Sequence, residues 1–175
     1  LSSNHAVKKA LSGEPGHAFE PLGDSPYAAV YAYPIKDDGT IIGASVFAYD
    51  LTTDDFIGLM KSGYDVECTI FSQSTRVKST IPGVEGTKLD NQTIINSVLS
   101  NGQEFTGENK IDGKDYFSDY TPLRNDDDSV TGMLFIAKSL ESIEAIKYTT
   151  LKIIVPVGVV LAVVLMILSY LFVRW

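Results

Sequence analysis

The feature that most constrains this chain is an uncharged segment of 21 residues near its end, Ile153–Val173. As an α-helix it would rise by about 30 Å, which is the thickness of the hydrocarbon core of a bilayer. Lys152 precedes the segment, and Arg174 and Trp175 follow it; these residue types anchor helices at the membrane interface. The alternative is a helix buried in a large core, but the rest of the chain is too small to surround one. We therefore predict one transmembrane helix over 153–173.

The part of the chain before this segment is polar and acidic. All 22 Asp and Glu residues and 13 of the 14 Lys and Arg residues precede Ile153, which gives that part a formal net charge of −9. This charge argues against nucleic acid as a partner and against docking on anionic lipid, because both need a basic surface. The single cysteine, Cys68, excludes an internal disulfide, and we expect a buried thiol on a strand.

The second constraining feature is an internal repeat. The stretch "YPIKDDGTIIG" at 33–43 returns as "TPLRNDDDSVTG" at 121–132, so that Pro34 matches Pro122 and Gly43 matches Gly132. A short amphipathic segment ending in glycine precedes each copy, "AVKKALSG" and "IINSVLSNG". Each copy then alternates apolar and polar residues around a polar turn, as antiparallel strands do. The repeated unit therefore reads as helix, strand, strand, turn, strand.

The repeat divides the chain into an α+β arrangement of two related modules. The residues between the copies add one helix and two strands, so 52–140 forms a complete membrane-proximal module. Residues 1–51 supply only a half-module of one helix and three strands. The polar stretch 141–152 is expected to form a juxtamembrane helix that continues into the span. The alternative is a single domain with an additional hairpin. Because the first module lacks its opening elements and no signal sequence is present, we expect the chain to be a fragment.

Several pieces of the complete module resemble the Cache sensor domains of bacterial chemoreceptors. The resemblance extends over about residues 20–140. The pieces that carry it, in order, are "VECTIF", "STRVKSTI", "EGTKL", "VLSNGQEFTGE", "IDGKDYFSDYTPLRN" and "VTGMLFIAKSL". The resemblance implies a PAS-like extracellular module with a five-stranded antiparallel sheet flanked by helices. It also implies binding of a small metabolite and a long helix that leads into a second membrane span.

Five residues of the complete module are candidates for ligand binding. In an extended strand, Arg76, Lys78 and Thr80 would share one face, and an arginine fork matches a carboxylate. Tyr116 and Tyr120 share a face of a later strand, where tyrosines can line a pocket. The alternatives are a solvated strand face for the first three and packing at the edge of the core for the tyrosines. The expected ligand is a small molecule such as a carboxylate or an amino acid.

The sequence offers little for catalysis or for metal binding. Both histidines, His5 and His17, lie near the start, and there is no nucleophile elbow, phosphate-binding glycine loop or metal-ligand cluster. The run Asn125–Asp128 contains oxygen ligands of the kind that calcium prefers, but it lacks the spacing and the distal glutamate of a calcium loop. We therefore expect a structural turn there, no cofactor, no metal and no enzymatic activity.

Together these features predict the sensory region of a bacterial membrane receptor of the methyl-accepting chemotaxis type. The sensor would be extracellular, the receptor a homodimer, and the output domain would follow on the cytoplasmic side beyond Trp175. Two alternatives remain open at this point: the ectodomain of a sensor histidine kinase, and an anchored binding or adhesion domain without signalling. The charge pattern around the span does not determine its orientation.

Overall fold

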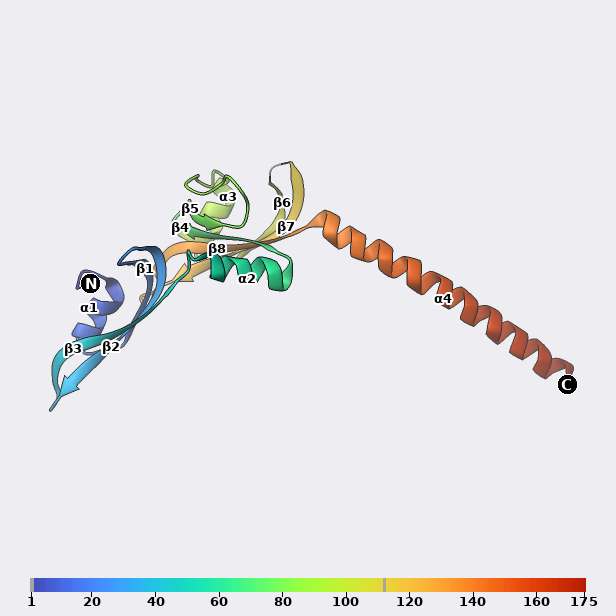
Figure 1. Cartoon of the computed structure of the whole chain (residues 1–175), viewed down its shortest axis with the longest axis horizontal. Helices are drawn as coiled ribbons and strands as arrows, with labels where there is room; N and C mark the ends of the chain where they lie inside the picture. Colours follow the sequence, from blue (N-terminus) through green and yellow to red (C-terminus); the bar gives the residue numbers. More distant parts are fainter. Residues whose placement is uncertain (1, 112) are drawn as a thin grey trace.

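Two antiparallel sheets follow one another along the chain, and a long helix leaves the second of them (Figure 1). The computed structural model describes residues 2–111 and 113–175. The first part consists of α1 (His5–Leu11), β1 (Gly16–Leu22), β2 (Ser25–Asp37) and β3 (Thr40–Asp50). The strands pair in the order β1-β2-β3. The β2–β3 turn is tight because Asp38 and Gly39 both take positive φ, 44° and 84°.

The second part contains the predicted five-stranded antiparallel sheet, in the order β5-β4-β8-β7-β6. Its elements are α2 (Asp54–Tyr64), β4 (Glu67–Ser72), β5 (Thr75–Ser79), α3 (Gln92–Ile95), a π-helical turn η1 (Asn96–Ser100), β6 (Phe105–Ile111), β7 (Lys114–Arg124) and β8 (Val130–Ser139). In Figure 1, α2 lies against one face of this sheet and α3 lies over the other. The α+β class and the five-stranded sheet are thus confirmed.

Helix α2 begins and ends one or two residues later than its sequence signals suggest. The sequence has a weak capping pattern in Thr52 and Asp55, but Thr53 is the N-cap, and its Oγ1 accepts a hydrogen bond from the backbone N–H of Phe56. The sequence also offers Gly63 as the end of the helix. The helix instead continues through Tyr64 and ends at Asp65, which adopts the left-handed conformation with φ of 53°. Aspartate tolerates this conformation better than most residues, so Gly63 is not needed as the stop.

The internal repeat is visible in the strand registers. In the first sheet Ile35 pairs with Gly43 and Ala32 with Val46. In the second sheet Leu123 pairs with Gly132 and Tyr120 with Phe135. Both hairpins have a register shift directly after the pair that contains the glycine. The strand pairs β2–β3 and β7–β8 therefore correspond residue by residue, with α1 in the place of α3 and η1.

Three apolar clusters form the core. The first lies between α1 and its sheet and is built mainly of alanine and valine, namely Ala6, Val7, Ala10, Ala18, Ala28, Val30 and Ala32. The second lies under α3 and η1 and contains larger side chains, among them Phe71, Tyr120, Met133 and Phe135. The third joins α2 to the opposite face of the second sheet and includes Tyr27 from β2. The buried side chains under α1 are therefore small, whereas those under α3 and η1 include aromatic rings.

The two sheets are joined by the turn after β7. The side-chain oxygen of Asn125 accepts the backbone N–H of Phe19, and the carboxylate of Asp126 accepts that of His17. The hydroxyl groups of Tyr27 and Thr131 are also hydrogen-bonded, at 2.9 Å. The segment predicted to be a structural turn therefore has a second role, because its polar side chains hold β1 against the second sheet.

The last element, α4 (Leu140–Arg174), is a single helix that begins directly after β8. Within the described part of the chain, its segment Tyr148–Arg174 is the one helix that is long and apolar enough to cross a membrane. Figure 1 shows α4 projecting away from both sheets, at the end opposite to the first sheet. Pro156 lies inside the helix.

Candidate functional site

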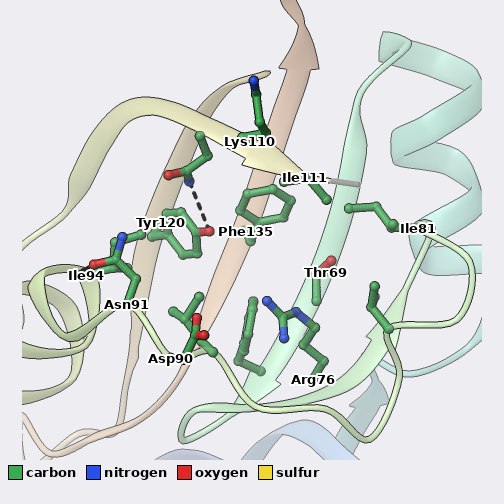
Figure 2. A pocket seen from close by; sticks show the side chains of 14 residues that line it. Thr69, Arg76, Ile81, Asp90, Asn91, Ile94, Lys110, Ile111, Tyr120 and Phe135 are labelled. Atoms are coloured by element: carbon green, nitrogen blue, oxygen red, sulfur yellow. Dashed lines mark hydrogen bonds between the residues drawn. The ribbon is translucent and has the colours of Figure 1, made fainter. Parts of the chain in front are cut away.

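A cavity of about 180 Å³ lies on the face of the five-stranded sheet that α3 covers. Strands β4, β5, β6, β7 and β8 provide its floor, and the segment 80–91 closes one side (Figure 2). The apolar lining consists of Phe71, Ile81, Val84, Leu89, Ile94, Ile111 and Phe135. The polar lining consists of Thr69, Arg76, Asp90, Asn91, Asn109, Lys110 and Tyr120. A cavity that combines apolar side chains with converging polar groups is suited to bind a small molecule.

Arg76 on β5 is the main cationic group inside this cavity. Its guanidinium carbon lies 5.3 Å from the centroid of the Phe71 ring, which is a cation–π distance. Its Nη1 donates to Thr87 Oγ1 at 2.9 Å and to the carbonyl oxygen of Lys88 at 3.0 Å. Among the residues that the structure describes, no carboxylate forms an ion pair with Arg76. The half-buried guanidinium therefore keeps donors and a positive charge available to a ligand.

The segment 80–91 is held in place mainly by backbone contacts with β5. The backbone N–H of Arg76 donates to the carbonyl of Thr87, and the N–H of Leu89 donates to that of Ser74. Arg76 thus supports the wall of the cavity as well as lining it. Any test of its binding role needs a variant that weakens this wall and keeps the guanidinium.

Tyr120 and Asn109 form the polar side of the cavity opposite Arg76. Tyr120 is 4% exposed, and its hydroxyl accepts a hydrogen bond from Asn109 Nδ2 at 3.2 Å (Figure 2). Burial raises the pKa of Tyr120 to about 12, although the nearby charge of Arg76 acts in the opposite direction. The phenol is therefore neutral at physiological pH and can donate its proton to a ligand oxygen.

Groups of both charges lie at the rim of the cavity. Lys110 and Asp90 are exposed and lie on different sides of the cavity in Figure 2. Lys110 is 3.5 Å from Asp115, and both side chains are exposed. Asn91 stands beside Asp90, and its side-chain oxygen caps α3 by accepting the N–H groups of Thr93 and Ile94. The arrangement suits a small anion near Arg76 and leaves a carboxylate at the rim for a second, cationic group.

The structure separates the three residues that were expected to share one face of β5. Phe71 pairs with Arg76 but Ile70 pairs with Lys78, so one extra residue, Val77, forms a β-bulge. The expected shared face is therefore wrong, because Lys78 lies on the opposite side of the sheet from Arg76 and outside the cavity lining. Its ammonium group binds Asp54 at 2.8 Å and Glu85 at 3.6 Å. The hydrogen bond to Asp54 raises the pKa of Lys78, against the effect of burial.

Thr80 and Tyr116 also lie outside the cavity lining. The Thr80 hydroxyl accepts the backbone N–H of Cys68 and donates to Glu67, so it fastens the end of β5 to β4. Tyr116 does share a face with Tyr120 and packs against the same core cluster. It lines a separate polar hollow near the start of α4. Of the five candidates, the structure brings together Arg76 and Tyr120.

Sequence reasoning missed the contribution of β6 and of segment 80–91. Asn109 and Lys110 lie on β6, whose alternating pattern gave no sign of a site. The sequence predicts a strand that ends at Ile81 and a turn that contains Val84, and it assigns neither these residues nor Leu89 to a site, yet all three line the cavity. One sequence signal for this part of the cavity was Asn91. As the N-cap it fixes where α3 begins, and the start of α3 lies at this edge of the cavity.

A second cluster of ionisable groups lies at the junction of the two sheets. His5 Nε2 donates to Asp126 Oδ1 at 2.6 Å, and Lys9 Nζ donates to Asp126 Oδ2 at 3.0 Å. Burial alone would raise the pKa of Asp126, but the hydrogen bonds from His5, Lys9 and the backbone of His17 outweigh it and lower the pKa to about 2. Because the ammonium group of Lys9 binds the carboxylate of Asp126, we interpret this cluster as an ion-paired contact that joins the two sheets.

Comparisons with known proteins agree with this architecture. The family model of single Cache domain 3 matches residues 51–150, which is more than half of the 175 residues. No curated protein sequence matches the chain. A solved structure named methyl-accepting chemotaxis protein X is 15% identical, with a TM-score of 0.51 over 79% of this chain and 55% of that chain.

Two further solved structures match the chain. An extracellular ligand binding receptor from Desulfohalobium retbaense DSM5692 is 14% identical, with a TM-score of 0.51 over 78% of this chain and 25% of that chain. The sensor domain of the V. cholerae histidine kinase DctB is 14% identical, with a TM-score of 0.47 over 79% of this chain and 61% of that chain. The chain thus spans less than two thirds of each of these structures. By the match over residues 51–150, the chain belongs to the single Cache domain 3 family of sensor domains.

Proposed function

We propose that this chain is the ligand-sensing and membrane-spanning region of a bacterial chemoreceptor and that its ligand is a small carboxylate or amino acid. The observation that carries the proposal is the guanidinium of Arg76, which lines a small cavity and has no carboxylate partner among the described residues. A planar guanidinium matches the two oxygens of a carboxylate. The neutral hydroxyl of Tyr120 adds a second donor.

The size and polarity of the cavity support this ligand class. Its volume of about 180 Å³ is below the ~300 Å³ at which drug-sized pockets begin, so the ligand is a small metabolite. Its apolar floor suits a short aliphatic chain, and Asp90 at the rim suits an ammonium group. A carboxylate needs only Arg76 and Tyr120, whereas an amino acid also uses Asp90.

Strand β8 is the proposed route from the cavity to the membrane. Phe135 lines the cavity, and the same strand ends at Ser139, where α4 begins at once. A shift of β8 on ligand binding therefore moves the start of a helix that continues into the predicted span. Such helix displacements are an established means of signalling, and they act between two copies in a homodimer.

The proposal places the sensor outside the cell and the output domain inside. Two fold relatives have TM-scores of 0.51. The name of one, an extracellular ligand binding receptor, agrees with this placement, and the name of the other, a methyl-accepting chemotaxis protein, agrees with the proposed type of receptor. A sensor histidine kinase would use the same sensor and the same helix, and the type of output domain distinguishes the two.

A thermal screen of the 175-residue chain in detergent micelles tests the proposal. Small mono- and dicarboxylates and L-amino acids are added one at a time, and the melting temperature is followed by scanning calorimetry. A ligand at a hundredfold excess over its dissociation constant stabilises the folded state by ~2.7 kcal/mol, which raises the melting temperature by roughly 5–10 °C for a chain of this size. A carboxylate or amino acid that stabilises the wild-type chain but not Arg76→Ala supports the proposal. The absence of any stabilising compound in these classes contradicts it.

A further inference from the structure

A row of polar groups crosses β6 and β7 on the face of the sheet that carries the cavity. Gly107 and Asn109 lie on this face of β6, and Ser118 and Tyr120 lie on the same face of β7, because residues two apart in a strand share a face. Gly107 and Ser118 are direct cross-strand partners. Ser118 is 1% exposed and Tyr120 is 4% exposed, so both polar side chains need defined hydrogen-bond partners.

These residues form a chain of hydrogen bonds that runs in one direction. A serine hydroxyl has one proton, and Ser118 donates it to the carbonyl oxygen of Gly107 at 3.0 Å. The Ser118 oxygen therefore accepts the next bond, which comes from Nδ2 of Asn109 at 2.8 Å. The same Nδ2 donates its second proton to the hydroxyl oxygen of Tyr120 at 3.2 Å (Figure 2). The amide oxygen of Asn109 cannot take the place of Nδ2, because it would face the lone pairs of Ser118.

The hydroxyl of Tyr120 is left with a proton that has no acceptor among the described residues. Since the hydroxyl oxygen accepts from Asn109, this proton is directed away from Asn109 and towards the cavity. The charge of Arg76 lies near, since it acts against the burial that raises the pKa of Tyr120. Nη1 of Arg76 donates to the cavity wall, whereas Nε and Nη2 have no partner in the described part of the chain. Donors on two sides of the cavity thus await the lone pairs of a ligand.

We propose that Asn109 is a positioning residue that fixes the hydroxyl of Tyr120 as a donor, so that the cavity selects a free carboxylate over the corresponding carboxamide. The inference rests on the proposed function, because it concerns the same cavity, and it adds the chemical group that the cavity rejects. A carboxylate has two oxygens and accepts from Arg76 and Tyr120 at once. A carboxamide of the same shape has one oxygen and one NH2 group, so at one end a donor meets a donor.

Arg76 favours the charge of a carboxylate, but it does not by itself exclude a carboxamide. A carboxamide can direct its oxygen to the guanidinium and its NH2 group to Tyr120, provided that the hydroxyl is free to turn and accept. The hydrogen bond from Asn109 prevents this turn. Sites that leave a buried polar group unpaired reject such analogues strongly. The selectivity therefore depends on Asn109, although Asn109 need not touch the reacting end of the ligand.

Matched pairs of compounds test the proposal. The probes are propionate and propionamide, succinate and succinamide, and L-alanine and L-alaninamide, each titrated into the 175-residue chain in detergent micelles with NMR detection. We expect the carboxylate of at least one pair to bind about 30-fold more tightly than its carboxamide. In Asn109→Leu, which is similar in size and has no donor, this ratio should fall about fivefold, because the freed hydroxyl accepts the carboxamide. Equal binding of both members of every pair to the wild-type chain would overturn the inference and leave the proposed function standing.

A double-mutant cycle shows whether Asn109 acts through Tyr120. Tyr120→Phe removes the hydroxyl, and in that background Asn109→Leu should change the ratio of the two affinities by less than about twofold. A change as large as in the wild-type background would overturn the proposal, because Asn109 would then act on the ligand by another route. The proposal also fails if Asn109→Leu weakens both members of a pair equally, since that is the effect of a residue that only supports the cavity.

A measurement without ligand separates this inference from the proposed function. In a chain with ¹³C-labelled tyrosine, the ¹³Cζ signal of Tyr120 at pH 7 responds to the hydrogen bonds of its hydroxyl, and Tyr120→Phe identifies the signal. We expect Asn109→Leu to move this signal. Glu108→Leu, which places the same side chain at an exposed position of β6, should leave it unchanged. If no probe binds the wild-type chain, the proposed function fails, and this signal alone decides the role of Asn109: a shift supports it, and an unmoved signal overturns it.

Discussion

Arg76 and Phe71 are direct partners across β5 and β4, and the guanidinium of one stacks at 5.3 Å on the ring of the other. The bulge at Val77 follows this pair and turns Lys78 to the opposite side of the sheet. One cation therefore lines the cavity, and the other binds Asp54 and Glu85. The bulge thus decides which of two neighbouring basic residues is available to a ligand.

The pKa of Tyr120 predicts a particular alkaline behaviour. The value of about 12 in the folded state lies above the ordinary value of 10.0, so the unfolded chain loses this proton first. The stabilisation is fully present below pH 10 and is lost as the pH rises through 12. Burial also raises the pKa of Tyr27 to about 12, so we expect Tyr120→Phe to reduce the amplitude of the last step of a tyrosine absorbance titration at about 295 nm and to leave the part that belongs to Tyr27. It should also flatten the loss of stability between pH 10 and 12. An unchanged titration curve would contradict the buried state of this phenol.

Asp126 predicts a loss of stability in acid. Its pKa of about 2 lies below the ordinary 3.8, so its contribution is present above pH 3.8 and is lost as the pH falls towards 2. Because its side chain is 8% exposed, Asp126→Asn should lower the free energy of unfolding at pH 7 by about 2 kcal/mol. The difference from the wild type should shrink at pH 2.

The neighbouring Asp127 serves as the matched control for this effect. Its side chain is 50% exposed, and hydrogen bonds from Ser129 lower its pKa. Asp127→Asn removes the same charge at the same turn but leaves the contacts with Lys9 and β1 intact. Urea unfolding of both variants between pH 2 and 7 separates the two roles. Equal effects of the two substitutions would show that Asp126 does not join the sheets in the way described.

The glycine pair of the repeat predicts unequal effects of the same substitution. Gly132→Ala places a methyl group 2.0 Å from the carbonyl oxygen of Phe71 and 2.4 Å from the hydroxyl of Tyr27. Because β4 and β8 are central strands, we expect a loss of at least 3 kcal/mol in unfolding free energy. Gly43→Ala in the 175-residue chain meets open space and should change stability by less than ~1 kcal/mol. Denaturant unfolding of the two variants checks this, and similar losses would contradict the described packing of β8.

Much of the fold could be predicted from the sequence because its signals are local. Alternation and turn residues predict the strands of the last meander at 104–111, 114–123 and 129–139, and the observed strands begin and end within one residue of these limits. The membrane helix follows from composition alone. The repeat also predicted the equivalence of the two glycines, which the strand registers bear out.

The cavity was harder to predict because it depends on contacts between distant segments. The single extra residue at Val77 reverses the side of the sheet to which the later residues of β5 point. The sequence "TRVKS" contains no signal that predicts this bulge. The wall formed by Ile81, Val84 and Leu89 depends on a loop returning over the sheet, which pattern reasoning treats as exposed. Asn109 was invisible because its importance comes from the hydroxyl of Tyr120, eleven residues further along the chain.

The most direct test of the central claim is a titration calorimetry experiment on three proteins: the wild-type chain, Arg76→Ala and Thr87→Ala. The titrant is the most stabilising compound from the carboxylate and amino-acid screen. Thr87→Ala removes the hydrogen bond between Arg76 and the Thr87 hydroxyl in the cavity wall, and it keeps the guanidinium and its bond to the carbonyl oxygen of Lys88. The account predicts at least a tenfold weaker affinity for Arg76→Ala, the equivalent of ~1.4 kcal/mol, and a change of less than threefold for Thr87→Ala. Equal losses in both variants would show that Arg76 only supports the wall. Unchanged affinity in Arg76→Ala would place the ligand elsewhere and contradict the account.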